Sequence, residues 1–189
     1  MSFTKTVLSA TVAVVISAGM SFADGDAMKN PMVGGAAMFA DKNIVENAVN
    51  SADHTTLVAA VTAAGLVETL QSEGPFTVFA PTNAAFDALP EGAVKTLLLP
   101  ENKEMLTTVL TCHVVAKAVM ADALQGMIAD DGGVHPVPTV GGCTLQASYA
   151  DGVMTLQDEN GGMATVTIAD VVQSNGVIHV IDAVLLPKM

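Results

Sequence analysis

Two apolar segments that lie far apart in the chain most constrain what it can fold into. The first, residues 76–86, has the sequence FTVFAPTNAAF, and the second, residues 174–187, has the sequence SNGVIHVIDAVLLP. Each joins a short apolar run to residues that favour turns or helix caps. Apolar residues occupy both faces of the first run, which suits a strand that is covered on both sides. The pattern predicts that both segments are strands that build one core.

The residues between 43 and 110 otherwise favour helices. Asp41 and Asp53 are suitable N-cap residues for the first two helices, and Gly65 ends the second. Thr82 can cap a short helix directly after the first apolar segment. The expected helices cover residues 43–50, 54–64, 66–70, 83–86, 93–99 and 101–110.

The second half of the chain changes to strand patterns. Asp151 and Gly152 separate two alternating runs, which is a strong hairpin signal. The expected strands cover residues 76–80, 112–115, 134–140, 143–150, 153–157, 164–172 and 177–186. Helices followed by antiparallel strands predict an α+β fold, with N-terminal helices packed on a C-terminal sheet.

The N-terminal residues 1–23 are predicted to be a signal peptide. Lys5 gives a short positive region, and residues 7–19 form an uncharged apolar run that is too short to span a bilayer comfortably. Small residues at Ser21 and Ala23 favour cleavage after Ala23. The alternative is an uncleaved anchor. We expect an exported product, periplasmic or extracellular, with no stable membrane insertion after cleavage.

Residues 24–40 are predicted to form a flexible N-terminal arm, followed by one domain over residues 41–188. The arm is rich in glycine and has little periodicity. Its methionines, Met28, Met32 and Met38, could suit a soft metal such as Cu(I). Because no His or Cys lies nearby, we interpret them as adaptable apolar contacts and expect no metal site.

The charge of the chain excludes two classes of partner. The formal net charge is −12, with seven lysines and no arginine. Nucleic acids and anionic membrane surfaces are bound through Lys and Arg, so neither is an expected partner.

The two cysteines, Cys112 and Cys143, are predicted to form a disulfide, because an even pair in an oxidising compartment is typically bonded. The alternative is a free buried pair. Two cysteines alone make a poor zinc site, since structural zinc normally takes four ligands.

Three landmarks in the right order resemble the fasciclin domain family, as in small secreted one-domain bacterial proteins. They are residues 76–86, His113 and residues 174–187. The family carries Tyr-His at the middle landmark, where this chain has Cys112-His113, and that departure fits the disulfide. The resemblance implies a fasciclin-like fold with helices packed on an antiparallel β-sandwich or wedge. The motif residues of this fold are Phe76, Phe79, Pro81, Thr82, Asn83, Phe86, His113, Asn175, Gly176 and His179.

The polar motif residues are expected to hold the structure together. A buried His in a strand needs a hydrogen-bond partner, so Thr82, Asn83, His113 and His179 are expected to share one polar network. Asn175-Gly176 is expected to form a tight turn with positive φ angles.

The resemblance implies adhesion rather than catalysis. Family members are extracellular or surface proteins that bind proteins, matrix or polysaccharide. In animal relatives an Asp-Ile pair before the second landmark contributes to integrin binding, and Asp170-Val171 matches that position here. We treat this pair as a candidate surface contact. The alternative is a solvent-facing aspartate at a strand end.

Two other functions, carriage of a ligand and hydrolysis, are alternatives to adhesion. Some algal relatives bind carotenoids, so the domain could carry a small apolar ligand in a groove between helices and sheet. Hydrolysis is the second, but none of the Gly-x-Ser-x-Gly, His-Glu-x-x-His and phosphate-loop motifs is present. Asp53-His54 is interpreted as helix capping rather than a catalytic pair. We expect a monomeric, non-catalytic binding module with no cofactor.

Overall fold

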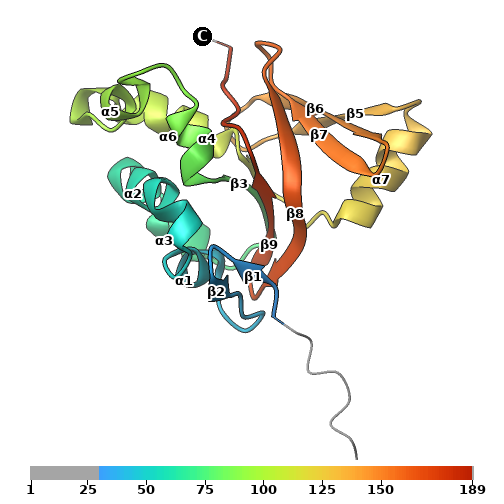
Figure 1. Cartoon of the computed structure of the whole chain (residues 1–189), viewed down its shortest axis with the longest axis horizontal. Helices are drawn as coiled ribbons and strands as arrows, with labels where there is room; N and C mark the ends of the chain where they lie inside the picture. Colours follow the sequence, from blue (N-terminus) through green and yellow to red (C-terminus); the bar gives the residue numbers. More distant parts are fainter. Residues whose placement is uncertain (1–29, 189) are drawn as a thin grey trace, which may run out of the picture.

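Helices fill the N-terminal half of the chain in the computed structural model, which describes residues 30–188. The helices before residue 112 lie together on one side of the molecule, next to the strands at residues 76–81 and 176–181 (Figure 1). The α-helices are α1 (Ile44–Ala48), α2 (Thr55–Ala64), α3 (Val67–Gln71), α4 (Asn83–Asp87), α5 (Ala93–Leu97), α6 (Lys103–Thr111) and α7 (Ala121–Asp130). Two 3₁₀ turns, η1 (Ala52–His54) and η2 (Pro100–Asn102), precede α2 and α6.

Seven strands form one mixed sheet in the order β4-β3-β9-β8-β7-β6-β5. They are β3 (Phe76–Pro81), β4 (Val114–Val115), β5 (Val134–Pro138), β6 (Thr144–Ala150), β7 (Val153–Gln157), β8 (Met163–Gln173) and β9 (Gly176–Ile181). Every neighbouring pair is antiparallel except β3 and β9, which run parallel with Phe76 opposite Gly176 and Pro81 opposite Ile181. The α+β prediction is therefore confirmed, and the expected all-antiparallel sheet is corrected at the β3–β9 pair.

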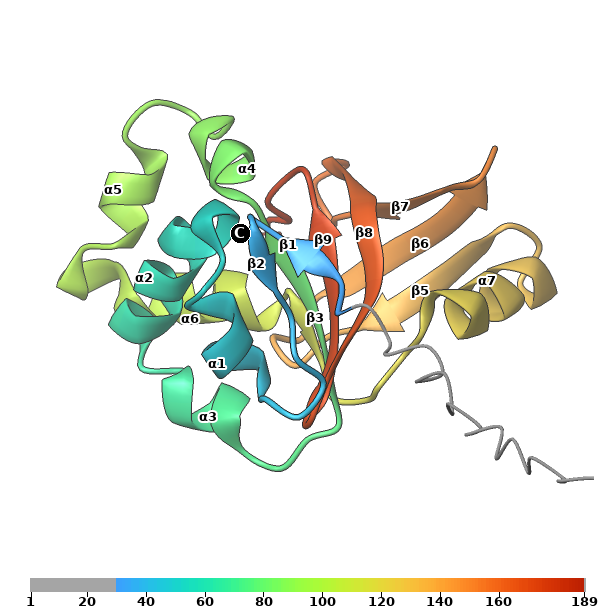
Figure 2. The same ribbon diagram turned by 60° about the horizontal axis from the view of Figure 1, so that its bottom comes forward.

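Strand β8 divides the sheet into two halves. Its first residues pair with β7 and its remainder with β9, with register irregularities on both sides of Ile168. Such bulges bend a strand and increase its twist. Strands β5–β7 turn away from β3 and β9 along it (Figure 2). The expected wedge is a single sheet bent at β8.

Two apolar cores follow from this bend. One lies between the helices and the central strands, where Leu57, Leu110 and Ile178 are buried. The other lies between α7 and the bent sheet, where Leu124, Leu145 and Leu156 are buried. Phe79 belongs to the second core although β3 also contacts the first, which explains why this strand is apolar on both faces.

Residues 30–40 pack on the domain, contrary to the expectation of a loosely packed arm. Strands β1 (Met32–Val33) and β2 (Ala36–Ala37) form a small hairpin. Val33 and Met38 are only 3% and 2% exposed. The buried Asn47 amide pairs with both backbone groups of Phe39, at 3.0 and 2.7 Å. The predicted signal peptide and residues 24–29 lie outside the described residues.

The helix starts differ from those expected. Asn43, not Asp41, caps α1, in a capping box with Glu46. Asp53 lies within η1, and His54 precedes α2 without a side-chain cap. Helix α7 was not expected at all, although Ala121, Leu124 and Ile128 follow helical spacing and are buried.

The predicted disulfide joins Cys112, directly after α6, to Cys143, directly before β6. Their Cα atoms are 5.4 Å apart. Both residues are buried, at 1% and 5% exposed. The bond ties the helical side of the molecule to the bent half of the sheet.

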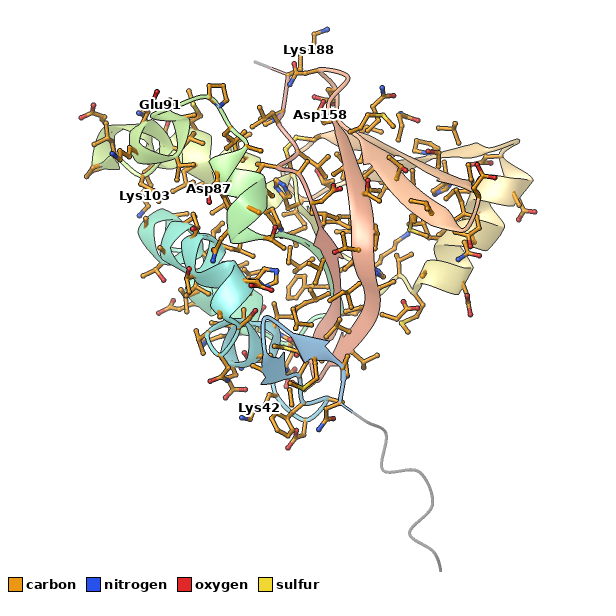
Figure 3. All side chains as sticks on the ribbon, viewed as in Figure 1. Lys42, Asp87, Glu91, Lys103, Asp158 and Lys188 are labelled. Carbon is orange, nitrogen blue, oxygen red and sulfur yellow. A yellow bond between two sulfur atoms is a disulfide. The ribbon has the colours of Figure 1, made fainter. Side chains whose placement is uncertain are left out.

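The chain after β9 is held by the turn between β7 and β8. Asp158 accepts hydrogen bonds from the Gly162 amide within its own turn, at 2.7 Å, and from the Leu186 amide, at 2.9 Å. It lies at the same end of the molecule as Lys188 (Figure 3). This contact explains why the apolar run 183–186 is partly buried without being a strand.

Candidate functional site

The two signature segments, residues 76–86 and 174–187, meet as neighbouring strands of the sheet. Strand β3 comes from the first and β9 from the second, and Phe79 lies opposite His179 in their parallel register. The two rings stack with centroids 5.7 Å apart. Pro81 ends β3, and Phe86 on α4 is buried in the helical core. The prediction that both segments form strands of the core is confirmed for residues 76–81 and 176–181, but their side chains contribute to two cores rather than one.

His179 is a structural residue with both ring nitrogens used. It is fully buried. Nε2 lies 2.9 Å from the carbonyl of Val119, and Nδ1 accepts from the amide of Asp170 at 3.2 Å. This assigns the proton to Nε2 of a neutral ring. Burial lowers the pKa of His179, while the Val119 carbonyl and the Asp170 charge oppose that shift.

His113 is buried in the opposite tautomer. Nδ1 lies 2.8 Å from the carbonyl of Val109, and Nε2 accepts from the amide of Leu185 at 3.0 Å. Burial lowers its pKa from 6.5 to about 4, against the smaller opposing effects of the Val109 carbonyl and Asp158. His113 thus links α6 to the C-terminal segment.

The expected network joining Thr82, Asn83, His113 and His179 is not formed, because each uses separate partners. Thr82 caps α4 through the amide of Ala85 at 3.3 Å. Asn83 accepts from the Thr56 amide at 3.0 Å and donates to the Ala52 carbonyl at 2.8 Å. These contacts position the start of α2 against α4.

Asn175 and Gly176 serve a different purpose from the expected positive-φ turn. Neither has a positive φ angle. The Asn175 side chain accepts from the Ile44 amide at 3.0 Å and donates to the Leu70 carbonyl at 2.8 Å, so it joins α1 to the end of α3. A Cβ atom at Gly176 would collide with the carbonyl of Phe76. Glycine is needed there for the close approach of β3 and β9.

Asp170 and Val171 do not form a surface pair. Val171 is fully buried, so its interpretation as a surface contact is wrong. Asp170 is half-buried in the irregular part of β8, with φ 57°, and its carboxylate accepts from the Ala121 amide at 2.7 Å. That bond satisfies a free amide at the first turn of α7. The same residue also donates its own amide to His179.

Ser51 and His54 have the spacing of a nucleophile and base but are not accessible. Ser51 Oγ lies 2.8 Å from His54 Nδ1, and the two residues are 2% and 4% exposed. Burial lowers the pKa of His54, opposed by the Ala80 carbonyl and Asp53. No substrate reaches this pair without opening the core.

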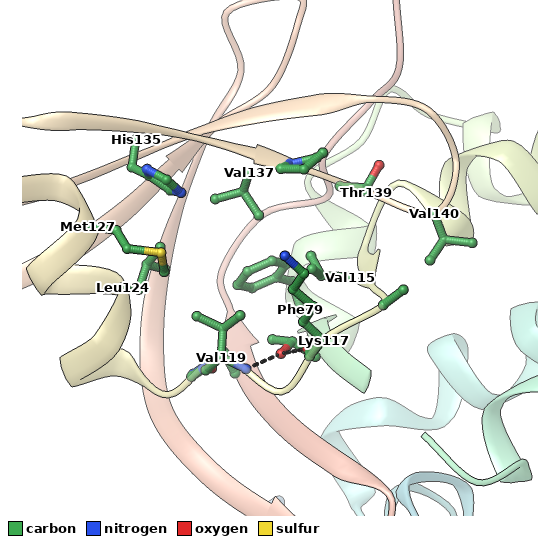
Figure 4. A pocket seen from close by; sticks show the side chains of 14 residues that line it. Phe79, Val115, Lys117, Val119, Leu124, Met127, His135, Val137, Thr139 and Val140 are labelled. Carbon is green, nitrogen blue, oxygen red and sulfur yellow. Dashed lines mark hydrogen bonds between the residues drawn. The ribbon is translucent and has the colours of Figure 1, made fainter. Parts of the chain in front are cut away.

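An apolar cleft of about 250 Å³, which we call the wedge cleft, lies between β4, β5, α7 and the Phe79–His179 pair (Figure 4). Buried Phe79, Val115, Leu124 and Val137 form much of its lining, and the exposed Val140 lies at its outer side. Sequence reasoning missed this cleft because it missed α7. The helical spacing of the residues now seen in α7 was the available signal.

Between residues 30 and 188, no group of three or more His, Cys, Asp or Glu is placed to hold a metal ion. Over the same residues, no helix is both long and apolar enough to cross a bilayer.

Several known proteins are similar to this chain. It is 48% identical over 161 residues to protein sll1483 of Synechocystis, covering 85% of this chain and 82% of that protein. It is 36% identical over 145 residues to the immunogenic protein MPB70 of Mycobacterium bovis, covering 74% and 66%. With human periostin the identity is 30% over 135 residues, which is 71% of this chain but 15% of periostin.

The fold has a counterpart among solved structures. A FAS1 domain pair from the insect cell adhesion molecule fasciclin I matches with a TM-score of 0.69 over 77% of this chain and 51% of that one, at 19% identity. The fasciclin domain family model matches residues 52–187, from η1 to the segment held by Asp158. The resemblance carried by β3, His113 and β9 is thereby confirmed, and the chain belongs to the fasciclin domain family.

Proposed function

We propose that this chain is an exported, non-catalytic interaction module that binds a cell-surface or extracellular protein or polysaccharide. The observation that carries the proposal is that the landmark histidines of the family form hydrogen bonds within the domain. His113 and His179 are buried and neutral, with both nitrogens bonded inside the domain. Residues used in this way hold a scaffold together and leave recognition to the surface. The solved relative named as a cell adhesion molecule supports the same role.

A polar groove at the β8–β9 turn is our candidate for that surface. Its volume is about 750 Å³. Exposed side chains of Gln71, Glu73 and Ser174 line it beside those of Met120 and Val172. Amide, hydroxyl and carboxylate groups of this kind can hydrogen-bond to peptide backbone or sugar hydroxyls. The groove therefore offers a better contact surface than the buried Val171.

Binding of the purified domain to intact cells and isolated surface polysaccharide of its host tests the proposal. Gln71→Arg/Ser174→Arg should reduce binding at least tenfold, because two long charged side chains would obstruct the groove. The matched control, Thr96→Arg/Gln157→Arg, adds the same charge at exposed positions outside the groove. Equal loss in both variants would contradict the groove, and no binding by the unmodified domain would contradict adhesion.

A second candidate function, carriage of a small apolar ligand, is favoured by the wedge cleft. Buried apolar side chains line it together with exposed residues that include Val140. The cleft is slightly smaller than the roughly 300–1,000 Å³ typical of sites for drug-sized ligands, so it suits a small molecule or one end of a longer one. Mass spectrometry of an organic extract of protein purified from its host tests this. A stoichiometric small molecule is expected, and a ligand-free extract would contradict carriage.

A further inference from the structure

The wedge cleft has a charge opposite in sign to that of the molecule. The chain carries 19 acidic residues and seven lysines. Yet the residues lining the cleft include Lys117 and no aspartate or glutamate. The lining also includes His135, whose ring is hydrogen-bonded to Asp131, so Lys117 is the lining cation without a carboxylate beside it. An apolar cavity with such a cation, in a strongly acidic protein, selects by sign of charge as well as by hydrophobicity.

Lys117 is free to act on a ligand. It is exposed. Between residues 30 and 188, the one contact with salt-bridge geometry is that of His135 with Asp131, at 2.6 Å, so Lys117 has no carboxylate partner there. Its side chain runs alongside Phe79 into the cleft (Figure 4). Its backbone carbonyl is fixed by the buried Thr77 hydroxyl at 2.6 Å, which anchors the residue at the cleft wall.

The remaining walls suit a flexible hydrocarbon chain. Leu124 and Met127 on α7 face Val137 on β5 across the cleft (Figure 4). Met127 is half-buried, and methionine adapts its shape to irregular apolar ligands. With Phe79 and His179 stacked on the inner side, the lining offers apolar area at one end and an ammonium group at the other.

We propose that the wedge cleft binds small amphiphiles with an anionic head group, of the aliphatic carboxylate class, with the chain among Leu124, Met127 and Val137 and the carboxylate at Lys117. This inference rests on the second candidate function and specifies its ligand. It is independent of the polar groove and of adhesion. The cavity of about 170 Å³ among α1, α2, α3 and α6 has no charged residue in its lining and so makes no such selection.

Calorimetric titration of the full domain with decanoate and with decan-1-ol tests the proposal. The unmodified protein should bind decanoate more tightly than decanol. Lys117→Met keeps an apolar side chain of similar length and should weaken decanoate binding about three- to tenfold, while decanol binding stays the same. Lys95→Met, an exposed lysine on α5, makes the same charge change outside the cleft and should leave both affinities unchanged. Val140→Trp should reduce binding of both ligands by filling the outer side.

The outcomes separate the inference from the carrier function. Equal affinities of Lys117→Met and the unmodified domain for decanoate, with both ligands lost in Val140→Trp, would overturn the role of Lys117 and leave apolar carriage standing. If binding of both ligands is unchanged in Val140→Trp, the ligands bind in another cavity and the proposed site is wrong. Failure of the unmodified domain to bind either ligand would overturn both, without bearing on adhesion.

Discussion

The buried histidines make the stability of this domain depend on pH at the scale of single residues. For His113 the folded pKa is about 4, against about 6.5 in the unfolded chain. Between these values the unfolded state binds more protons, so the free energy of unfolding rises with pH. The stabilisation is complete above pH 6.5 and is lost as the pH falls to 4. Burial of His54 and His179 acts in the same direction.

We expect this effect to be large enough to measure. A pKa shift of that size at one residue changes the free energy of unfolding by about 3 kcal/mol. Urea denaturation at pH 7, 5 and 4 should show the decline, and NMR of the imidazole rings should show His113 as the Nδ1-protonated neutral tautomer until about pH 4. A His113 resonance that titrates near pH 6.5 in the folded protein would contradict this account.

Asp170 provides a second test at the residue scale. Asp170→Ala removes the acceptor for the Ala121 amide and places alanine at positive φ, which should lower the free energy of unfolding by about 1–2 kcal/mol. Asp170→Asn keeps an oxygen acceptor and tolerates that φ, so it should stay within about 0.5 kcal/mol of the unmodified protein. Urea denaturation of both variants decides. A large, equal loss in both would show that the negative charge matters instead.

At the scale of elements, the domain depends on the close approach of β3 and β9. Both strands have buried residues on both faces, and the glycine at the start of β9 lets the Phe76 carbonyl approach. Parallel pairing of two such strands places the helices on one face and the bent sheet on the other.

Two glycine substitutions test this dependence. Gly176→Ala should cost about 2 kcal/mol or more, since its Cβ would displace the backbone of β3. Gly126→Ala, on the exposed face of α7 with open space around it, should instead stabilise by about 0.5–1 kcal/mol. Thermal and urea unfolding should show a lower free energy of unfolding for Gly176→Ala and a higher one for Gly126→Ala. A tolerated alanine at position 176 would show that the strands can separate without cost.

At the scale of the whole molecule, the disulfide connects parts that meet only through the fold. It closes a loop of about 32 residues that contains α7 and β5, and it should stabilise the domain by roughly 3–4 kcal/mol in the chain-entropy account. Cys112→Ala/Cys143→Ala should therefore unfold at markedly lower urea concentration. Adding a reductant to the unmodified protein should approach the same midpoint. The double variant itself should not respond to reductant, and a response there would assign the effect elsewhere.

The sequence by itself determined the elements whose signals are local. The buried strand at residues 76–81, the Asp151-Gly152 hairpin and most helices depend on the apolar spacing and turn chemistry of adjacent residues, and they lie where expected. The cysteine pairing followed from the presence of two cysteines and from the expected export of the chain. Interactions within a few residues, or in the case of the cysteines the presence of one possible partner, determine these features.

Only the tertiary structure decided how distant residues use their polar groups and where open space remains. Asp170 became a partner of α7, 49 residues away, and Asn175 became a brace for α1, 131 residues away. The two histidines took opposite tautomers because His113 combines the nearby Val109 carbonyl with the Leu185 amide, 72 residues away, whereas His179 bonds the Val119 carbonyl, 60 residues away. The wedge cleft exists because the sheet bends at β8 and α7 packs against β5 and β6. No local pattern encodes these contacts, since each depends on where the whole sheet places its partner.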